Sequence, residues 1–337
     1  MRKLATIRKI DAITPIEGAE AIECATVGGW RVVVKKDEYT AGDLAVYCEI
    51  DSWIPHDLAP FLSKGKEPRE FEGIKGERLR TIKLRGQISQ GLLLPRQVAL
   101  DKIGEIYEDM DVTELLHINK WERPINAQLA GICKGNFPTE IPKTDQERCQ
   151  NLKSEIQAAA TAGTGFEITE KLEGSSMTCY LIRGEFGVCS RNMDLKETAD
   201  NAFWKTARKQ DIEAKMNAID PYWSFAIQGE LVGPGIQGNI YNLKETQFYV
   251  YDVYNIMTGE YLLPVDRVKL IESMGLIHVP ILASELILAS ESIDEILKFA
   301  EGSSILNSKI EREGVVFKEV RGGFTFKAIS NRYLLGE

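Results

Sequence analysis

Short strands dominate the first third of the chain and restrict what it can fold into. Five segments have the β-branched, aromatic or alternating composition of strands: residues 5–10, 29–34, 44–50, 79–85 and 91–95. Few long helical patterns interrupt them. Because closing short strands into a barrel removes exposed sheet edges, we expect a small five-stranded barrel of the OB type over residues 1–115.

A basic segment lies within this predicted barrel. Residues 64–85 carry eight lysines and arginines against four glutamates, although the whole chain has a formal net charge of −9. Lys83 and Arg85 alternate with apolar residues there, which places both side chains on one face of a strand. OB-type barrels frequently bind oligonucleotides through such a face. We therefore predict that Lys83 and Arg85 contact RNA; a solvated strand face is the alternative interpretation.

Size and composition argue against a membrane or secreted protein. The chain has 337 residues, of which 44% are hydrophobic and 27% charged, as in an ordinary globular protein of about two domains. No apolar run approaches the roughly 20 residues that cross a bilayer. The N-terminus lacks the apolar core of a signal peptide. We expect a cytoplasmic protein without a membrane segment.

The cysteines and histidines do not suggest a site of their own. The six cysteines are scattered without a C-x-x-C pair, and the chain has only three histidines. A disulfide framework, a thiolate zinc site and a multi-histidine metal site are therefore not expected.

The pattern changes after the predicted barrel. Residues 116–140 are broken by glycines and prolines, as is typical of a connector. Residues 141–337 then alternate strands with helices, and helices are expected at residues 144–158, 196–219, 264–274 and 292–301. The first of these begins with a capping pattern at residues 144–147. The predicted fold class is α+β, with the barrel followed by a second domain over residues 141–337.

One lysine stands out in the second domain. Residues 170–176 read Glu-Lys-Leu-Glu-Gly-Ser-Ser and follow an alternating segment that ends a strand. Lys171 lies between Glu170 and Glu173 with a glycine just beyond, which favours a nucleophile that is held covalently. An ammonium group cannot attack, and burial, a metal ion or a second cation would favour the neutral amine. Taken alone, so short a pattern is more often a surface lysine–glutamate pair in a turn.

Further stretches of matching chemistry follow Lys171. They are a hairpin end with Arg191, a strand end with Glu230 beside a glycine-rich loop, an aromatic strand at residues 248–254, and Glu313 ahead of a strand that is followed by Lys327 in the last strand. Each stretch is weak by itself. Their order and spacing together make a specific set.

With these residues in this order, the chain resembles the covalent nucleotidyltransferases, the superfamily of ATP-dependent ligases and RNA capping enzymes. Residues 171–174 match its nucleophile motif, and its later motifs match Glu230, the strand with Tyr249 and Tyr251, Glu313 and Lys327. The chain is most similar to two-domain RNA ligases of the Deinococcus and Naegleria type, which carry an OB domain ahead of the transferase domain. Residues 86–91, 142–151 and 233–239 resemble further signatures of these ligases. The resemblance spans nearly the whole chain and implies an ATP-grasp-like nucleotidyltransferase fold for the second domain.

The resemblance also implies residue roles. Lys171 would be the nucleophile toward ATP, and Lys327 would bind the α-phosphate. Glu173, Glu230 and Glu313 would orient ribose, the nucleophile and waters on a Mg²⁺ or Mn²⁺ ion. The remaining nucleotide contacts would come from Glu170 at the adenine amino group, Arg191 at a phosphate or ribose, and Tyr251, or Tyr249 on the opposite face, stacked on the base.

Two positions depart from the family's pattern. Glu173 stands where the nucleophile motif usually has aspartate, and its longer arm can still reach a ribose hydroxyl or a metal-bound water. Ile329 stands where the final motif often has a second lysine. Either Lys327 serves the α-phosphate alone, or Lys318 or Arg332 helps it.

The activity implied is that of an ATP-dependent RNA ligase in RNA repair, acting as a monomer. Lys171 would form a lysyl-AMP, pass AMP to an RNA 5′-phosphate, and a 3′-hydroxyl would then seal the strand. A nicked duplex, a broken tRNA loop and free ends all remain possible substrates, and the source could be cellular or viral.

Two rival functions use parts of the same pattern. A DNA ligase or a capping guanylyltransferase generally carries an OB domain after the last motif, whereas this chain ends at Glu337, ten residues beyond Lys327. A non-catalytic RNA-binding protein would not need the intact set of Lys171, Glu230, Glu313 and Lys327. Both rivals are therefore less favoured than an RNA ligase.

Overall fold

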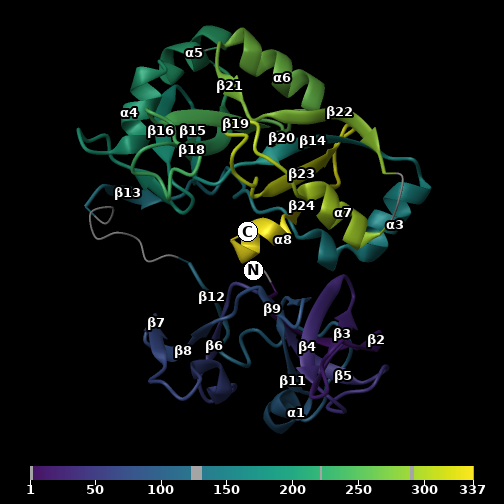
Figure 1. The fold of residues 1–337 in the computed structure, drawn as a ribbon. Coiled ribbons are helices and arrows are strands. Elements are labelled where there is room, and N and C mark those ends of the chain that lie inside the picture. The colour runs from purple at the N-terminus through teal and green to yellow at the C-terminus, as the bar shows by residue number, and fades with distance from the viewer. Residues whose placement is uncertain (1–2, 123–130, 221, 289–291, 337) are drawn as a thin grey trace. The chain divides into compact units, whose positions relative to one another are not determined.

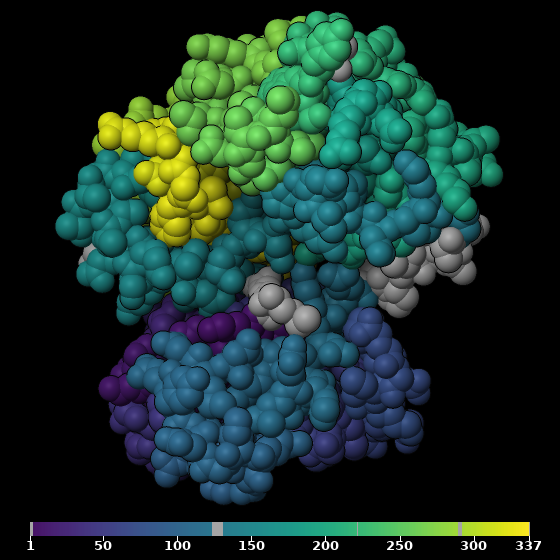
Figure 2. Space-filling model, turned by 180° about the vertical axis from the view of Figure 1, so that it is seen from behind, coloured from purple at the N-terminus to yellow at the C-terminus, as the bar shows by residue number. Residues whose placement is uncertain are grey.

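The structure is a computed structural model that describes residues 3–122, 131–220, 222–288 and 292–336. The chain divides into two compact units, Met1–Pro124 and Ile125–Glu337 (Figure 1). Figure 2 shows the surface of each unit in the same colours. The first unit extends past the predicted end of the barrel because Leu116 and Ile118 lie in its core.

The first unit consists of short antiparallel strands. Its sheets, with strands in spatial order, are β1 (Ala5–Lys9), β5 (Leu44–Cys48) and β11 (Leu92–Pro95); β2 (Ala12–Pro15), β3 (Ile22–Val27) and β4 (Trp30–Lys35); β12 (Asn119–Lys120), β6 (Ser52–Pro55), β8 (Ile74–Arg78) and β7 (Arg69–Phe71); and β10 (Gln87–Ser89) with β9 (Ile82–Leu84). Between them lie a short 3₁₀ helix, η1 (Pro60–Ser63), and α1 (Gln97–Ile103). Ala5 and Ile7 of β1 pack with Val46 and Cys48 of β5 in the core, since alternate residues of a strand share one face.

The predicted strand at residues 79–85 is wrong in extent and in pattern. Only β9 (Ile82–Leu84) forms there, paired with β10 in a two-stranded hairpin. Arg85 lies in the turn, with a left-handed φ of 50°. Ile82 and Leu84 keep 48% and 38% of their surface exposed, because this hairpin leaves both faces of β9 in solvent. Lys83 therefore alternates with apolar residues in sequence, but no buried face separates them.

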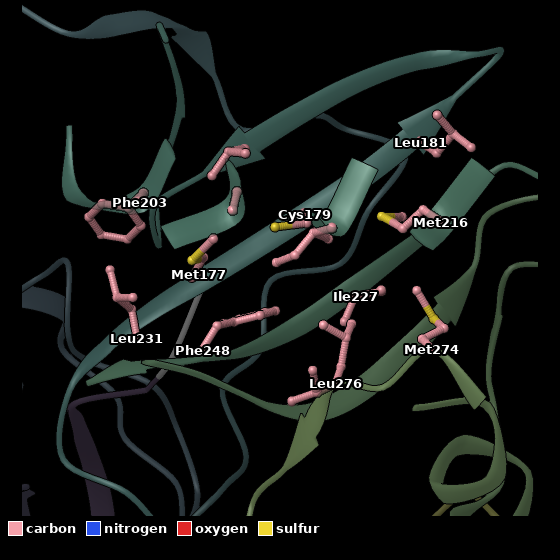
Figure 3. Close-up of a cluster of buried hydrophobic side chains, with 14 of the residues drawn as sticks. Met177, Cys179, Leu181, Phe203, Met216, Ile227, Leu231, Phe248, Met274 and Leu276 are labelled. Atoms are coloured by element: carbon pink, nitrogen blue, oxygen red, sulfur yellow. The ribbon is translucent and has the colours of Figure 1, made fainter. Parts of the chain in front are cut away.

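The larger sheet of the second unit has eight strands within the described residues. In spatial order they are β13 (Cys133–Asn136), β17 (Met193–Leu195), β16 (Glu185–Cys189), β15 (Ser175–Ile182), β18 (Phe225–Val232), β19 (Gln247–Asn255) and β20 (Glu260–Tyr261), with β21 (Ile277–His278) parallel to β19. One face is covered by α4 (Ala202–Lys209), α5 (Ile212–Ile219) and α6 (Pro264–Ser273) (Figure 1). Figure 3 shows the core between them, where Met177 and Cys179 of β15 pack with Phe203 of α4 and Met216 of α5.

The smaller sheet carries the predicted nucleophile. Its order is β22 (Ile281–Ile287), β14 (Gly165–Lys171), β23 (Gly314–Glu319) and β24 (Thr325–Ile329). Phe166 of β14, Phe317 of β23 and Phe326 of β24 pack on one face against α3 (Lys153–Thr161) and α7 (Ile293–Ala300). The chain then continues into α8 (Asn331–Leu335). Because successive residues of a strand point to opposite faces, the residues next to each of these phenylalanines in its strand lie on the other face of the sheet.

The helix predictions are right for two segments and wrong for two. α6 and α7 confirm the expected helices at 264–274 and 292–301. The single helix expected at 196–219 is two helices, because Asp211 adopts a left-handed φ of 54° between α4 and α5.

The capping pattern at residues 144–147 does not start a helix. A short 3₁₀ turn, η2 (Cys149–Asn151), comes first, and α3 begins only at Lys153. Asp145, which the capping pattern assigned to the helix start, instead pairs with Lys327. No helix in the described part of the chain is both long and apolar enough to span a membrane.

Candidate active site

Lys171 is the last residue of β14, and Glu313 directly precedes the neighbouring strand β23. Lys171 lies opposite Gly314 in the β14–β23 register, and its Nζ donates to Glu313 Oε1 at 2.6 Å. Only 28% of the lysine side chain and 16% of the glutamate side chain are exposed. Two residues far apart in sequence are therefore held as a partly buried ion pair by strand pairing.

The glycine after the lysine allows the turn to lie against β18. A Cβ on Gly174 would sit 2.3 Å from the Leu231 carbonyl oxygen and 2.9 Å from Glu230 Cγ. Any side chain there would collide with backbone, so only glycine brings the nucleophile motif this close to Glu230.

Glu230 adds a second carboxylate beside Lys171. It lies on β18 opposite Ser176 of β15. Burial raises the pKa of the Glu230 carboxyl to about 8, although the positive charge of Lys171 acts to lower it. Glu313 and Glu173 raise this pKa further, and Arg191 lowers it. The structure therefore brings these five predicted residues within electrostatic reach of one another.

Lys327 faces the same side of the smaller sheet as Lys171. In register, Lys327 lies opposite Val316, and Val316 lies opposite Thr169, two residues before Lys171. Its Nζ donates to Asp145 Oδ1 at 2.9 Å, with 11% of the lysine side chain exposed.

Asp145 joins Lys327 to a second predicted cation. Arg191 lies in the loop after β16, with its Nη2 3.5 Å from Asp145 Oδ2. Asp145 therefore holds the two predicted phosphate-binding cations, Lys327 and Arg191, on one carboxylate.

Glu173 is bound by two tyrosines. Its backbone N–H donates to the Tyr241 hydroxyl at 2.6 Å, and the Tyr333 hydroxyl donates to its Oε2 at 2.8 Å. Tyr241 is buried next to Leu172, and Tyr333 belongs to α8.

Glu170 is placed differently from Lys171. It lies opposite Val315, which belongs to the core on the helix-covered face of the smaller sheet. Its Oε2 accepts a hydrogen bond from the Ile305 N–H at 2.8 Å, and burial raises the pKa of its carboxyl. Glu170 therefore points to the opposite face of β14 from Lys171, and its contact with an adenine amino group stays a prediction.

Lys318 is part of a buried ion network. Its Nζ donates to Asp252 Oδ1 and to the Tyr251 carbonyl oxygen, both at 2.6 Å. Arg267 of α6 lies 3.7 Å from the same Asp252 carboxylate and pairs with Glu167 of β14. Burial lowers the pKa of the Lys318 amine, while Asp252 raises it. In the structure Lys318 links β23 to β19 and α6, so it does not compensate for the missing second lysine without leaving Asp252.

Ile329 and Arg332 are the other two positions that bear on the missing second lysine. Ile329 lies opposite Gly314 and is 4% exposed, in the same row as Lys171. Arg332 is exposed and lies 3.5 Å from Glu311. Arg191, by contrast, lies beside Asp145, the partner of Lys327.

The prediction that Tyr249 and Tyr251 point to opposite faces is wrong. Phe248 and Val250 pack in the core under the larger sheet, whereas Tyr249 and Tyr251 both pack with the cluster around Leu172. Tyr249 and Tyr251 are two residues apart, so the ordinary alternation of a strand already places them on one side. The β-bulge in the β18–β19 pairing lies at Tyr251, and beyond it Val253 returns to the core with Phe248 and Val250. The Tyr251 hydroxyl shares hydrogen bonds with Thr144 Oγ1 at 2.9 Å and Ser176 Oγ at 3.4 Å.

The donor set suits a divalent ion held through water. Among the described residues, no three histidine, cysteine or carboxylate side chains converge as a direct metal cage. The carboxylates of Glu173 and Glu313 nevertheless lie close enough to Glu230 to add to the rise that burial causes in its pKa. An excess of negative charge on oxygen ligands attracts Mg²⁺ or Mn²⁺, which commonly keep several waters.

The predicted RNA contacts are in the first unit. Lys83 lies in β9 and Arg85 in the turn that follows, both exposed.

Three residues of the site were missed from the sequence. Asp145 had a usable signal, because it lies within residues 142–151, which resemble an RNA ligase signature. Tyr241 and Tyr333 gave none, since an isolated tyrosine is ordinarily a core or surface residue.

Comparisons with known proteins agree with this arrangement. An OB-fold domain model matches residues 4–96, and an RNA ligase model matches residues 164–329. A search of curated protein sequences found no significant match.

Solved structures of Naegleria gruberi RNA ligase resemble the whole chain. A variant with AMP and manganese has a TM-score of 0.92 at 47% identity, covering 99% of this chain and 98% of that one. A variant with ATP and manganese has the same TM-score and identity, covering 98% of each chain. The ligase with pyrophosphate has a TM-score of 0.91 at 47% identity, covering 99% and 98%. The first unit is therefore an OB-fold domain, the second is an RNA ligase domain, and the chain belongs to the family of ATP-dependent RNA ligases.

Proposed function

We propose that this ligase joins an RNA 3′-hydroxyl to an RNA 5′-phosphate through an AMP that is carried first by Lys171. The observation that supports this most directly is the convergence of Lys171 of β14 with Glu230 of β18 and with Glu313, which directly precedes β23. Among the compared structures, variants of the Naegleria enzyme contain ATP or AMP with manganese.

Three displacements at phosphorus make up the reaction. The Lys171 ammonium first gives up a proton, and its Nζ then attacks the α-phosphorus of ATP. An N–P bond forms, the bond to the β-phosphate oxygen breaks as pyrophosphate leaves, and the nitrogen releases a second proton to water. An oxygen of the RNA 5′-phosphate then attacks the same phosphorus and the N–P bond breaks. Finally the RNA 3′-oxygen attacks the 5′-phosphorus, loses its proton, and releases AMP.

The residues around Lys171 orient these steps. Glu313 fixes the Nζ by its ion pair, so the amine is positioned before ATP binds. Lys327 and Arg191 both pair with Asp145. They can exchange this partner for phosphate oxygens, which accept charge-assisted hydrogen bonds in the same way as a carboxylate. A divalent ion among the carboxylates would supply positive charge that offsets the charge developing on the phosphates.

The tyrosine side of the site suits the nucleoside. Tyr249 and Tyr251 lie on one side of β19 with Leu172 and Val232, an apolar surface next to the nucleophile. Aromatic rings stack on bases with little regard to sequence. We assign Tyr251 or Tyr249 to the adenine and Glu173 to the ribose or a metal-bound water.

The first unit is assigned to RNA. Exposed Lys83 and Arg85 lie at a hairpin together with exposed Ile82 and Leu84. Cations that contact phosphates combined with apolar surface against bases are typical of OB-fold nucleic-acid binding. We further propose that the enzyme acts as a monomer in the cytoplasm.

Adenylylation with labelled nucleotide tests the proposal. The protein is incubated with α-labelled ATP or GTP and Mn²⁺, denatured and separated by electrophoresis. We expect label from ATP on the wild type and none on Lys171→Ala. Lys209→Ala is the matched control, because Lys209 also pairs with a glutamate but lies far along the chain on α4, and it should be labelled normally.

The chase of the labelled protein identifies the substrate. Addition of a nicked duplex with an RNA 5′-phosphate should move the label to RNA and then release it as AMP when the nick is sealed. Label from GTP alone would indicate capping chemistry, sealing of DNA but not RNA ends would indicate a DNA ligase, and absence of label would leave the RNA-binding interpretation.

A further inference from the structure

The carboxylate of Glu173 accepts a hydrogen bond from a residue near the C-terminal end of the chain. The Tyr333 hydroxyl donates to Glu173 Oε2 at 2.8 Å, across 160 residues. The N–H of the same glutamate donates to the Tyr241 hydroxyl at 2.6 Å. Two phenols from distant segments therefore fix both the side chain and the backbone of Glu173.

The helix that carries Tyr333 is itself anchored to the Glu313 segment. Ser330 caps α8 by accepting a hydrogen bond from the Tyr333 N–H at 3.2 Å, and it is fully buried. Its hydroxyl donates to Glu311 Oε1 at 2.8 Å, and its N–H donates to the Glu313 carbonyl oxygen at 2.9 Å. The position of the Tyr333 ring is therefore tied to the same loop that supplies the partner of Lys171.

The phenol is poised as a donor. Burial raises the pKa of Tyr333 above its ordinary value, and the charges of Glu313 and Glu173 raise it further. An ordinary phenol, with a pKa of about 10, is protonated at neutral pH, so the Tyr333 O–H donates to the carboxylate.

Glu173 stands where the resembling motif usually has aspartate, which places its carboxylate one C–C bond, about 1.5 Å, farther from the backbone. A longer side chain has an additional rotatable bond and loses more conformational freedom when it is held in one position. We propose that Tyr333 is a positioning residue that holds this longer carboxylate in one orientation toward the nucleotide. A carboxylate accepts through two oxygens, so Oε1 keeps the capacity to accept from a ribose hydroxyl or a metal-bound water while Oε2 is held.

This inference rests on the proposed role of Glu173 in nucleotide binding. Its test is a double-mutant cycle of Tyr333→Phe and Glu173→Asp on the rate of lysyl-AMP formation. Loss of a hydrogen bond to a charged group should slow Tyr333→Phe about 10-fold. In the Glu173→Asp background the phenol no longer reaches the carboxylate, so adding Tyr333→Phe should change the rate by less than about 2-fold.

Binding supplies a readout that does not depend on catalysis. In the non-reactive Lys171→Ala chain, calorimetric titration with ATP and Mn²⁺ measures affinity alone. Tyr333→Phe should weaken that affinity by up to about 10-fold, with the same lack of additivity in the Glu173→Asp background.

Tyr180→Phe is the matched control. The Tyr180 hydroxyl donates to Asp194 Oδ2 at 2.9 Å, so it is also a tyrosine–carboxylate hydrogen bond, more buried than that of Tyr333 and with no part in the proposed site. It should lower the melting temperature at least as much as Tyr333→Phe does, with no loss of adenylylation rate or ATP affinity.

The outcomes separate the inference from the function on which it rests. Additive effects of Tyr333→Phe and Glu173→Asp, or wild-type rates for Tyr333→Phe while Glu173→Ala is slow, would overturn the positioning role alone. Wild-type rates for Glu173→Ala would overturn the role of Glu173 and with it this inference. Absence of any lysyl-AMP on the wild type would overturn the proposed function.

Discussion

Lys327 and Asp145, 182 residues apart in the sequence, form an ion pair with 2.9 Å between Nζ and Oδ1. The backbone confirms the neighbourhood, because the Lys327 N–H donates to the Glu147 carbonyl oxygen and Arg148 forms a parallel bridge with Lys327. The segment at residues 144–147, in which the sequence predicted a helix start, therefore runs along the edge of β24. Its acidic residue binds a cation of the predicted active site.

Asp145→Asn should destabilise the ligase domain. The Lys327 side chain is 11% exposed, and the substitution removes a carboxylate charge from beside a nearly buried ammonium. Since Asp145 itself is one-third exposed, water reduces the cost to about 1–3 kcal/mol of unfolding free energy. Urea unfolding followed by circular dichroism measures the change. Asp109→Asn, which breaks the exposed pair with Arg8, is the control and should cost less than about 1 kcal/mol; equal effects of the two variants would contradict the prediction.

Glu230→Gln should change how stability depends on pH in metal-free buffer. The folded-state pKa of about 8 lies above the ordinary value of 4.5, so between these values the folded state binds a proton that the unfolded state has released. The wild type therefore loses stability as pH rises from about 5 to 8, and the glutamine variant lacks this loss.

The difference should favour the variant increasingly toward pH 8.5, by at most roughly 4–5 kcal/mol. Denaturant unfolding with a chelator present, at pH 5, 6.5 and 8.5, gives the values. A constant difference across this range would show that Glu230 is not held protonated.

His278→Gln should reduce the sensitivity of the fold to acid. Burial lowers the pKa of His278 to about 4, and the charge of Arg267 lowers it further. Arg267 Nε donates to His278 Nε2 at 3.0 Å, which requires the neutral ring, and Gln keeps an acceptor for that bond.

The sign follows from the direction of the shift. Between pH 6.5 and 4 the unfolded state binds a proton that the folded state rejects, so the wild type loses up to roughly 3 kcal/mol as pH falls through this window. Melting temperatures of the two proteins are measured at pH 8, 6, 5 and 4.5. Relative to its own value at pH 8, the melting temperature of the wild type should fall more at low pH than that of the variant. An identical decline in both proteins would argue that another group causes the acid sensitivity.

Lys83→Ala combined with Arg85→Ala should weaken RNA binding without affecting adenylylation. If both side chains contact phosphates, the slope of log K against log salt should fall in magnitude by about 1.4–1.8. Fluorescence anisotropy with a nicked RNA duplex at several salt concentrations measures the slope. Arg96→Ala with Lys102→Ala, two exposed basic residues at α1 in the same unit, controls for net charge. An equal effect of both pairs would mean that only total charge matters.

The sequence determined much of the fold because its signals are local. Four strands of the first unit (β1, β4, β5 and β11), the lysine-glycine turn, and the helices at 264–274 and 292–301 follow from alternation, periodicity and glycine placement, which need no knowledge of distant residues. The β9 hairpin failed for the same reason: alternation predicts a buried face only when a core lies beneath it, and none lies beneath Ile82 and Leu84.

The ordered set of Lys171, Glu230, Glu313 and Lys327 also came from the sequence, because each residue stands at the end or inside of a recognisable strand. Its completion did not. Only strand register brings Lys171 to Glu313, and only the tertiary fold brings Asp145 to Lys327 and Tyr333 to Glu173. Contacts across more than a hundred residues leave no periodic trace in the chain, since hydrogen bonds and ion pairs are selected by the three-dimensional neighbourhood that packing creates.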